Sequence, residues 1–197
     1  MLGRLSWLMA TAIVTSTLAA QSSAHAQERD VRNAVESVAG IYSSIYLHEA
    51  GHALAAKAFG ATDVVIEVPR KGSIMNGGTT AQFPAPLSAA QRQICAASGL
   101  FAANLAGEFV LQQPGLHASP YAQWILGTSV VSNFIHVTQH YTRIRGVKGW
   151  VGNDIDQYEL AGGNPHAFSA VLVAYSLWTL QRMQKRDVPL FFVSLRF

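Results

Sequence analysis

The stretch VRNAVESVAGIYSSIYLHEAGHALAAKAF, residues 31–59, decides most of what the sequence says about the fold. Its apolar residues recur every three or four positions, which is the spacing of one face of an α-helix. Gly60 follows directly, and a glycine at this position commonly ends a helix. We therefore expect one long helix over residues 31–59.

The composition of the whole chain limits the classes of protein to consider. The chain has 197 residues, of which 50% are hydrophobic and only 13% are charged. A chain of this length can bury a sizeable core as one domain. The formal net charge of +3 comes from scattered basic residues, without a long basic run interleaved with aromatic residues. We therefore expect no binding of nucleic acid, whereas contact with a membrane surface stays open.

The first 26 residues have the pattern of an export signal. Arg4 precedes an apolar run over residues 5–20, and Ala24-His25-Ala26 has the A-x-A form of a cleavage site. The run is short for a membrane span, which needs about 20 apolar residues. We expect cleavage after Ala26, with an uncleaved membrane anchor as the alternative. Residues 27–197 would then form a single exported domain, in the periplasm or attached to the membrane on its periplasmic side.

The rest of the chain predicts more helices and one small β element. Residues 62–83 are rich in β-branched residues and contain the turn signal Asn76-Gly77-Gly78, which favours a pair of strands. Further helices are expected over residues 89–112 with Ser88 as N-cap, over 118–142, over 154–161, and from Asn164 or Pro165 onward. The expected fold is mainly α with a small β hairpin, an α+β class.

The first expected helix carries the pattern H-E-x-x-H at His48, Glu49 and His52. Because residues four apart share one face of a helix, the two histidines can present their rings to one Zn²⁺ ion. Glu49 can take a proton from a metal-bound water and pass it to a leaving amine. The motif therefore predicts a zinc peptidase with Glu49 as general base and acid. The alternative is two hydrogen-bonded core histidines, although a buried Glu49 without a metal would be costly.

A catalytic zinc ion usually has three protein ligands, so one ligand must come from another part of the chain. The candidates beyond the motif are the acidic residues Asp63, Glu67, Glu108, Asp154, Asp156, Glu159 and Asp187, and the histidines His117, His136, His140 and His166. Asp154 opens a helix after a glycine-containing loop, which is a good position from which to direct a carboxylate. Glu108 lies in an otherwise apolar helix and should be paired with another group.

Two further sets of polar residues lie in apolar helices. His136 and His140 are four residues apart, and a second metal site or a role in orienting substrate is one interpretation. We favour the polar end of a helix, because no acidic residue neighbours them in sequence. Asn104 and Asn133 are expected to be hydrogen-bonded core residues rather than catalytic groups.

The segment HEAGHALAAKAFGATDVVIEVPRKGSIMNGGTT, residues 48–80, resembles the peptidase domain of membrane-anchored AAA metalloproteases of the FtsH type. In that family a HEAGHA helix is followed by a strand with a PRG-like turn and a segment with Gly and Thr. VGNDIDQYELAGG, residues 151–163, resembles the family's segment whose Asp is the third zinc ligand, which implies Asp154 here. The resemblance covers most of residues 40–162 and implies a zincin-like helical core. It does not extend to ATP-driven unfolding, because the chain has no Walker A motif.

The chain is also similar to intramembrane site-2-type proteases, which have a HExGH motif, an asparagine in an apolar helix, here Asn133, and a later Asp. Three hypotheses follow. The first is a zinc peptidase that acts on peptide or protein substrates. The second is a zinc-binding envelope scaffold or regulator without proteolytic activity, and the third is an intramembrane protease.

Overall fold

The computed structural model describes residues 2–71, 76–142 and 152–191, with side chains from residue 27 onward. In these parts of the chain it contains five α-helices, one 3-10 helix and a two-stranded antiparallel sheet. Their order is α1 (Leu2–Ala58), β1 (Thr62–Glu67), β2 (Gly78–Gln82), α2 (Ala89–Gln112), η1 (Pro114–Leu116), α3 (Pro120–Thr142), α4 (Asp154–Leu160) and α5 (Pro165–Lys185). The expected class, mainly α with a small hairpin, is confirmed.

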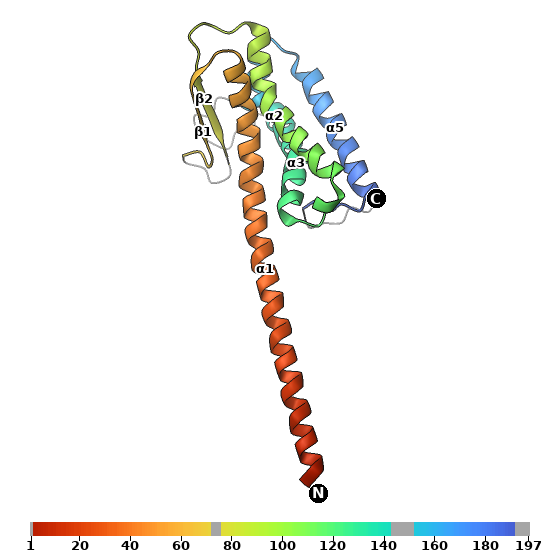
Figure 1. Ribbon diagram of the computed structural model, residues 1–197. Coiled ribbons are helices and arrows are strands. Elements are labelled where there is room, and N and C mark those ends of the chain that lie inside the picture. The colour runs from red at the N-terminus through yellow and green to blue at the C-terminus, as the bar shows by residue number, and fades with distance from the viewer. Residues whose placement is uncertain (1, 72–75, 143–151, 192–197) are drawn as a thin grey trace.

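Helix α1 is 57 residues long, and its N-terminal part extends far beyond the other elements (Figure 1). Its C-terminal part packs against α2, α3 and the hairpin. The helix ends at Ala58, and Gly60 follows with a φ of 84°, a conformation that favours glycine. The expected end is confirmed, but the helix begins earlier than expected because neither glycine nor proline interrupts residues 4–39. Cleavage after Ala26 stays a prediction.

The hairpin forms from the β-branched segment after α1, as expected. Ile66 pairs with Thr79, and Val65 pairs with Thr80. The sheet packs on the C-terminal part of α1, the part that carries the H-E-x-x-H motif. The hairpin that directly follows α1 in sequence therefore also lies against α1 in the fold.

The helices after the hairpin have the expected caps. Ser88 and Gln91 form a reciprocal capping box at the start of α2, and the side chain of Asn164 caps α5. One core cluster joins α2, α3 and the end of α5, with Leu111, Leu126 and Met183 fully buried. A second cluster consists of Leu100, Ile155 and Leu172, from α2, α4 and α5. The second cluster holds the short helix α4 against its neighbours.

Helix α2 is the one helix, within the described residues, that is long and apolar enough to cross a membrane. Only 39% of its most apolar window is buried inside the protein. Its outer face exposes the large side chains of Ile94, Phe101, Leu105 and Phe109. Length and composition also fit the core helix of a soluble protein, so they do not assign α2 to a membrane.

Candidate metal centre

His48, His52 and Asp154 come together where α1 meets the start of α4. His48 Nε2 lies 3.2 Å from Asp154 Oδ2, and His52 Nε2 lies 3.4 Å from Asp154 Oδ1. The two histidine Nε2 atoms are 3.2 Å apart. Each of the three residues therefore directs one ligand atom to a common point, and these atoms lie within 4.8 Å of one another.

These separations fit a small tetrahedral cation. Ligands at about 2.0–2.1 Å from a tetrahedral zinc ion stand roughly 3.3 Å from one another. Asp154 Oδ2 is buried and accepts no hydrogen bond from the described residues, even though His48 Nε2 is only 3.2 Å away. A cation bound to the two histidine Nε2 atoms and to one carboxylate oxygen of Asp154 would compensate the buried negative charge, so the three residues can hold a metal ion.

The charges within this group suit a cation. Burial acts to raise the pKa of Asp154, but the positive charges of His48 and His136 lower it well below its usual value. Burial acts to lower the pKa of His52, but the hydrogen bond to Asp154 and its charge raise the pKa to about 9. Without a metal, Asp154 and His52 therefore form a charged pair at neutral pH, and a bound cation would take the place of the proton on His52.

The other ring nitrogen of His52 is held by the backbone of α2. His52 Nδ1 lies 2.7 Å from the carbonyl oxygen of Cys95, and Ser98 Oγ lies 3.4 Å from the same nitrogen. In the neutral ring that metal binding requires, a hydrogen bond from Nδ1–H to a carbonyl leaves the lone pair on Nε2. The backbone of α2 thus orients His52 toward the candidate metal position.

Glu49 lies between α1 and the hairpin and is buried. Thr79 Oγ1, on β2, donates to Glu49 Oε2 at 2.8 Å and also lies 2.9 Å from the Glu49 carbonyl oxygen. Gly77 approaches so closely that a Cβ there would stand 2.5 Å from Glu49 Cγ. The negative charge of Glu49 is also among the causes that raise the pKa of His52. The hairpin thus holds Glu49 through one carboxylate oxygen.

Two glycines allow α1 and α2 to approach each other at the motif. A Cβ at Gly99 would stand 2.2 Å from His52 Nε2 and 2.7 Å from His48 Nε2. A Cβ at Gly51 would stand 2.3 Å from the carbonyl oxygen of Ser98. A role for Gly99 was not predicted from the sequence. Its position inside an apolar helix could have indicated one, because glycine is unfavourable in a helix unless close packing requires it.

The start of α4, which carries Asp154, is fastened to α3. Asn153 caps α4 by accepting from the backbone N–H groups of Ile155 and Asp156, and its Nδ2 donates to the His136 carbonyl oxygen at 2.7 Å. Asp156 Oδ1 lies 2.7 Å from His140 Nδ1. These contacts fix the position of Asp154 relative to α3.

His136 and His140, interpreted from the sequence as the polar end of a helix, have acidic partners from a distant part of the chain. His140 pairs with Asp156, and His136 Nδ1 lies 3.9 Å from Asp154 Oδ2. Both acidic residues come from α4, which is distant in sequence, so no local pattern shows these pairs. The group His140, Asp156 and Glu159 also has ligand atoms within 4.8 Å of one another.

Glu108, Asn104 and Asn133 have partners away from the candidate metal centre. Glu108 forms a two-point ion pair with Arg182, with both nitrogen–oxygen distances at 2.7 Å, so the expected partner of Glu108 exists. The structure does not bring Glu108 into either group of candidate ligands within the described residues. Asn133 Nδ2 donates to Asn104 Oδ1 and Ser176 Oγ, both at 2.9 Å, which confirms hydrogen-bonded core asparagines.

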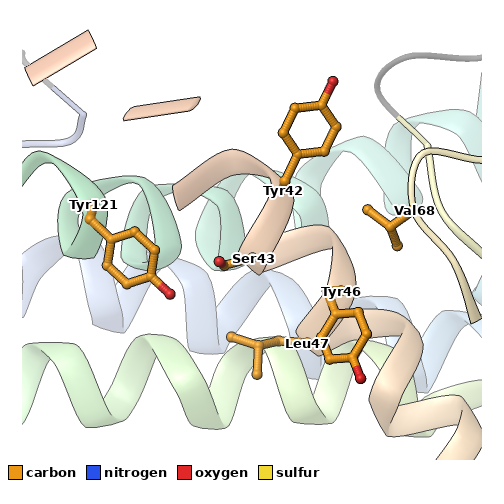
Figure 2. Close-up of a pocket in the computed structure, with 6 residues that line it drawn as sticks. All are labelled: Tyr42, Ser43, Tyr46, Leu47, Val68 and Tyr121. Carbon is orange, nitrogen blue, oxygen red and sulfur yellow. The ribbon is translucent and has the colours of Figure 1, made fainter. Parts of the chain in front are cut away.

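A pocket of about 400 Å³ lies beside α1, before the motif (Figure 2). It is lined by Tyr42, Ser43, Tyr46, Leu47, Val68 and Tyr121. Ser43 and Leu47 share a helix face, and that face is turned more than about 100° from the faces of His48 and His52, because each residue advances the helix by about 100°. The pocket is therefore separate from the candidate metal centre.

Comparison with known proteins adds no assignment. No family model matches the chain, and neither a curated protein nor a solved structure matches it. The resemblance to FtsH-type and site-2-type proteases stays a prediction, and the case for function rests on the geometry of the candidate centre.

Proposed function

We propose that this protein is a zinc-dependent peptidase in which His48, His52 and Asp154 hold the metal and Glu49 is the general base and acid. One observation carries the proposal: both motif histidines and a carboxylate from a distant helix meet at separations of 3.2–3.4 Å. Those separations suit a tetrahedral zinc ion with one position left for water or substrate. A buried glutamate beside the centre supplies the remaining group that peptide hydrolysis needs.

Zinc, when bound, would lower the pKa of a water molecule and polarise the scissile carbonyl group. Thr79 donates to Glu49 Oε2, so Oε1 would be the oxygen of Glu49 that accepts a proton from that water. Glu49 would then pass this proton to the leaving amine nitrogen as the carbon–nitrogen bond breaks, while the water oxygen stays on the carbonyl carbon. Thr79 keeps the carboxylate oriented through both transfers.

The hairpin offers a binding mode for the substrate. A two-stranded sheet leaves each strand with one unpaired edge, and peptides often bind to such an edge as an added strand. Strand β2 also holds Glu49 through Thr79, so a peptide along the hairpin would lie close to the general base. We therefore propose an extended peptide segment as substrate class.

The test measures zinc content and peptide cleavage separately. The native protein should contain one zinc ion per chain and cleave unstructured peptides, whereas Asp154→Ala should lose the metal. Glu49→Gln should keep the zinc and lose about 10²–10⁴-fold in kcat, as expected when a general base is removed. Asp187→Asn, at an exposed position after α5, is the control and should retain both properties. Native protein without stoichiometric metal would refute the proposal.

One observation favours a different function. His136 lies 3.9 Å from Asp154 Oδ2, and a fourth protein ligand would close the site, as in structural zinc sites. The protein would then be a zinc-binding scaffold or regulator. A cobalt-substituted protein distinguishes the two, because an open site takes up added azide with a change in visible absorption and a closed site does not.

For location we propose export, because the first 26 residues have the pattern of a secretory signal. The exposed apolar face of α2 favours the intramembrane alternative. Release of the protein by osmotic shock without detergent would exclude the intramembrane alternative.

A further inference from the structure

His136 lies on the side of Asp154 that faces α3. Its Nδ1 atom is buried and makes no hydrogen bond within the described residues. The nearest charged group is Asp154, whose Oδ2 is 3.9 Å from His136 Nδ1. The ring of His136 also lies 5.6 Å from the ring of His48, measured between centroids. His136 therefore directs an unused nitrogen toward the candidate metal centre.

The unused nitrogen faces an unused oxygen. Within the described residues, Asp154 Oδ2 is likewise buried and without a hydrogen bond. Buried donors and acceptors in folded proteins nearly always have partners, so two unpaired atoms at this distance indicate a contact that forms in another state of the site. Binding of a metal to one carboxylate oxygen would leave the other oxygen available to His136.

We infer that His136 is a positioning residue for the metal centre, which donates its Nδ1–H to the Asp154 oxygen that does not bind the metal. The inference rests on the proposed metal site. Carboxylates that bind metals are commonly held by such hydrogen bonds from outside the ligand set, which orient them and raise metal affinity.

The geometry distinguishes this role from metal ligation. The candidate ligand atoms within 4.8 Å of one another belong to His48, His52 and Asp154, and His136 is not part of that group. The His136 carbonyl oxygen also accepts from Asn153 Nδ2 at 2.7 Å. His136 would thus hold Asp154 in two ways. Its carbonyl oxygen binds the side chain of the preceding residue, Asn153, and its ring nitrogen would bind the Asp154 carboxylate.

The experiment measures zinc affinity by competition with a chelator, using the full chain and three substitutions at one position. His136→Leu and His136→Gln should bind zinc about 10–100-fold more weakly, because neither has a donor where Nδ1 lies. His136→Asn should bind within about threefold of native, because its amide nitrogen occupies the place of Nδ1 and donates in the same direction. His117→Asn is the distant control, and its affinity should not change.

Circular dichroism and thermal unfolding of each variant establish that the compared proteins are folded. A purely structural His136 would lower stability in all three variants without the recovery of zinc affinity in His136→Asn. Native-like affinity in His136→Leu or His136→Gln, or an asparagine variant as weak as these two, would overturn the inference while leaving the metal centre intact. A native protein that binds no zinc would instead refute the proposed function itself.

Discussion

Gly99 on α2 lies so close to His52 that a methyl group on its Cα would stand 2.2 Å from His52 Nε2. Real Cβ atoms do not approach other atoms to this distance, so any side chain at residue 99 must displace the histidine or separate the helices. The same methyl group would stand 2.7 Å from His48 Nε2. The positions of His48 and His52 therefore depend on residue 99 of the neighbouring helix having no side chain.

We predict that Gly99→Ala weakens zinc binding at least tenfold and lowers the free energy of unfolding by about 1–3 kcal/mol, as overpacked sites do. Chelator competition and urea unfolding measure the two effects. Gly115→Ala is the control, because a Cβ there meets no atom within 4 Å. Unchanged zinc affinity in Gly99→Ala would contradict the assigned ligands.

Thr79→Val should reduce catalysis without removing the metal. The substitution removes the hydroxyl that donates to Glu49 Oε2 at 2.8 Å. Leaving a buried carboxylate oxygen without its donor costs about 1–3 kcal/mol, so we expect a lower free energy of unfolding and a lower kcat. Zinc content should stay at the native level. Thr80→Val, at the exposed neighbouring position, should behave as native in all three measurements.

Asn153→Ala should lower both stability and zinc affinity, because Asn153 caps α4 and binds the His136 carbonyl oxygen. Loss of an N-cap costs about 0.5–2 kcal/mol. Asn164→Ala is a matched control, since Asn164 caps α5 with the same two backbone hydrogen bonds. It should lose similar stability and keep its zinc affinity. Equal zinc affinities in the two variants would show that the cap does not position Asp154.

The ion pair between Glu108 and Arg182 predicts a pH dependence of stability. The hydrogen bonds from Arg182 lower the pKa of Glu108 from 4.5 to about 2. A carboxyl group with a lowered folded-state pKa contributes stability that is complete above its unfolded pKa and is lost as the pH falls through its folded pKa. The contribution of Glu108 should therefore be complete above about pH 4.5 and disappear toward about pH 2.

Glu108→Gln isolates this contribution. Because the pair is partly exposed to solvent, we expect a loss of only about 1 kcal/mol in the free energy of unfolding at pH 7. The difference from native protein should shrink between pH 4.5 and pH 2 in urea unfolding series. A difference that is constant over this interval would show that the ion pair does not carry the effect. Zinc content should be unchanged, since Glu108 lies outside the candidate ligand groups.

Local chemistry explains the part of the fold that sequence reasoning predicted. The capping box of Ser88, the Asn164 cap and the stop at Gly60 depend on neighbours within a few residues, so each could be recognised in the sequence. The spacing of His48 and His52 also follows from helix geometry alone. The first helix began earlier than expected, because the export-like segment is itself helix-forming and no residue in it ends the helix.

The sequence by itself thus determined the helices, the hairpin and a histidine pair four residues apart on one face. Only the tertiary structure decided which carboxylate faces that pair, because Ile155 in the core and the Asn153 bond to α3 hold the start of α4 in place. The same packing pairs Glu108 with Arg182, and it places Asp154 and Asp156 near His136 and His140. A ligand set assembled from separate helices depends on long-range packing, and no local periodicity in the chain records it.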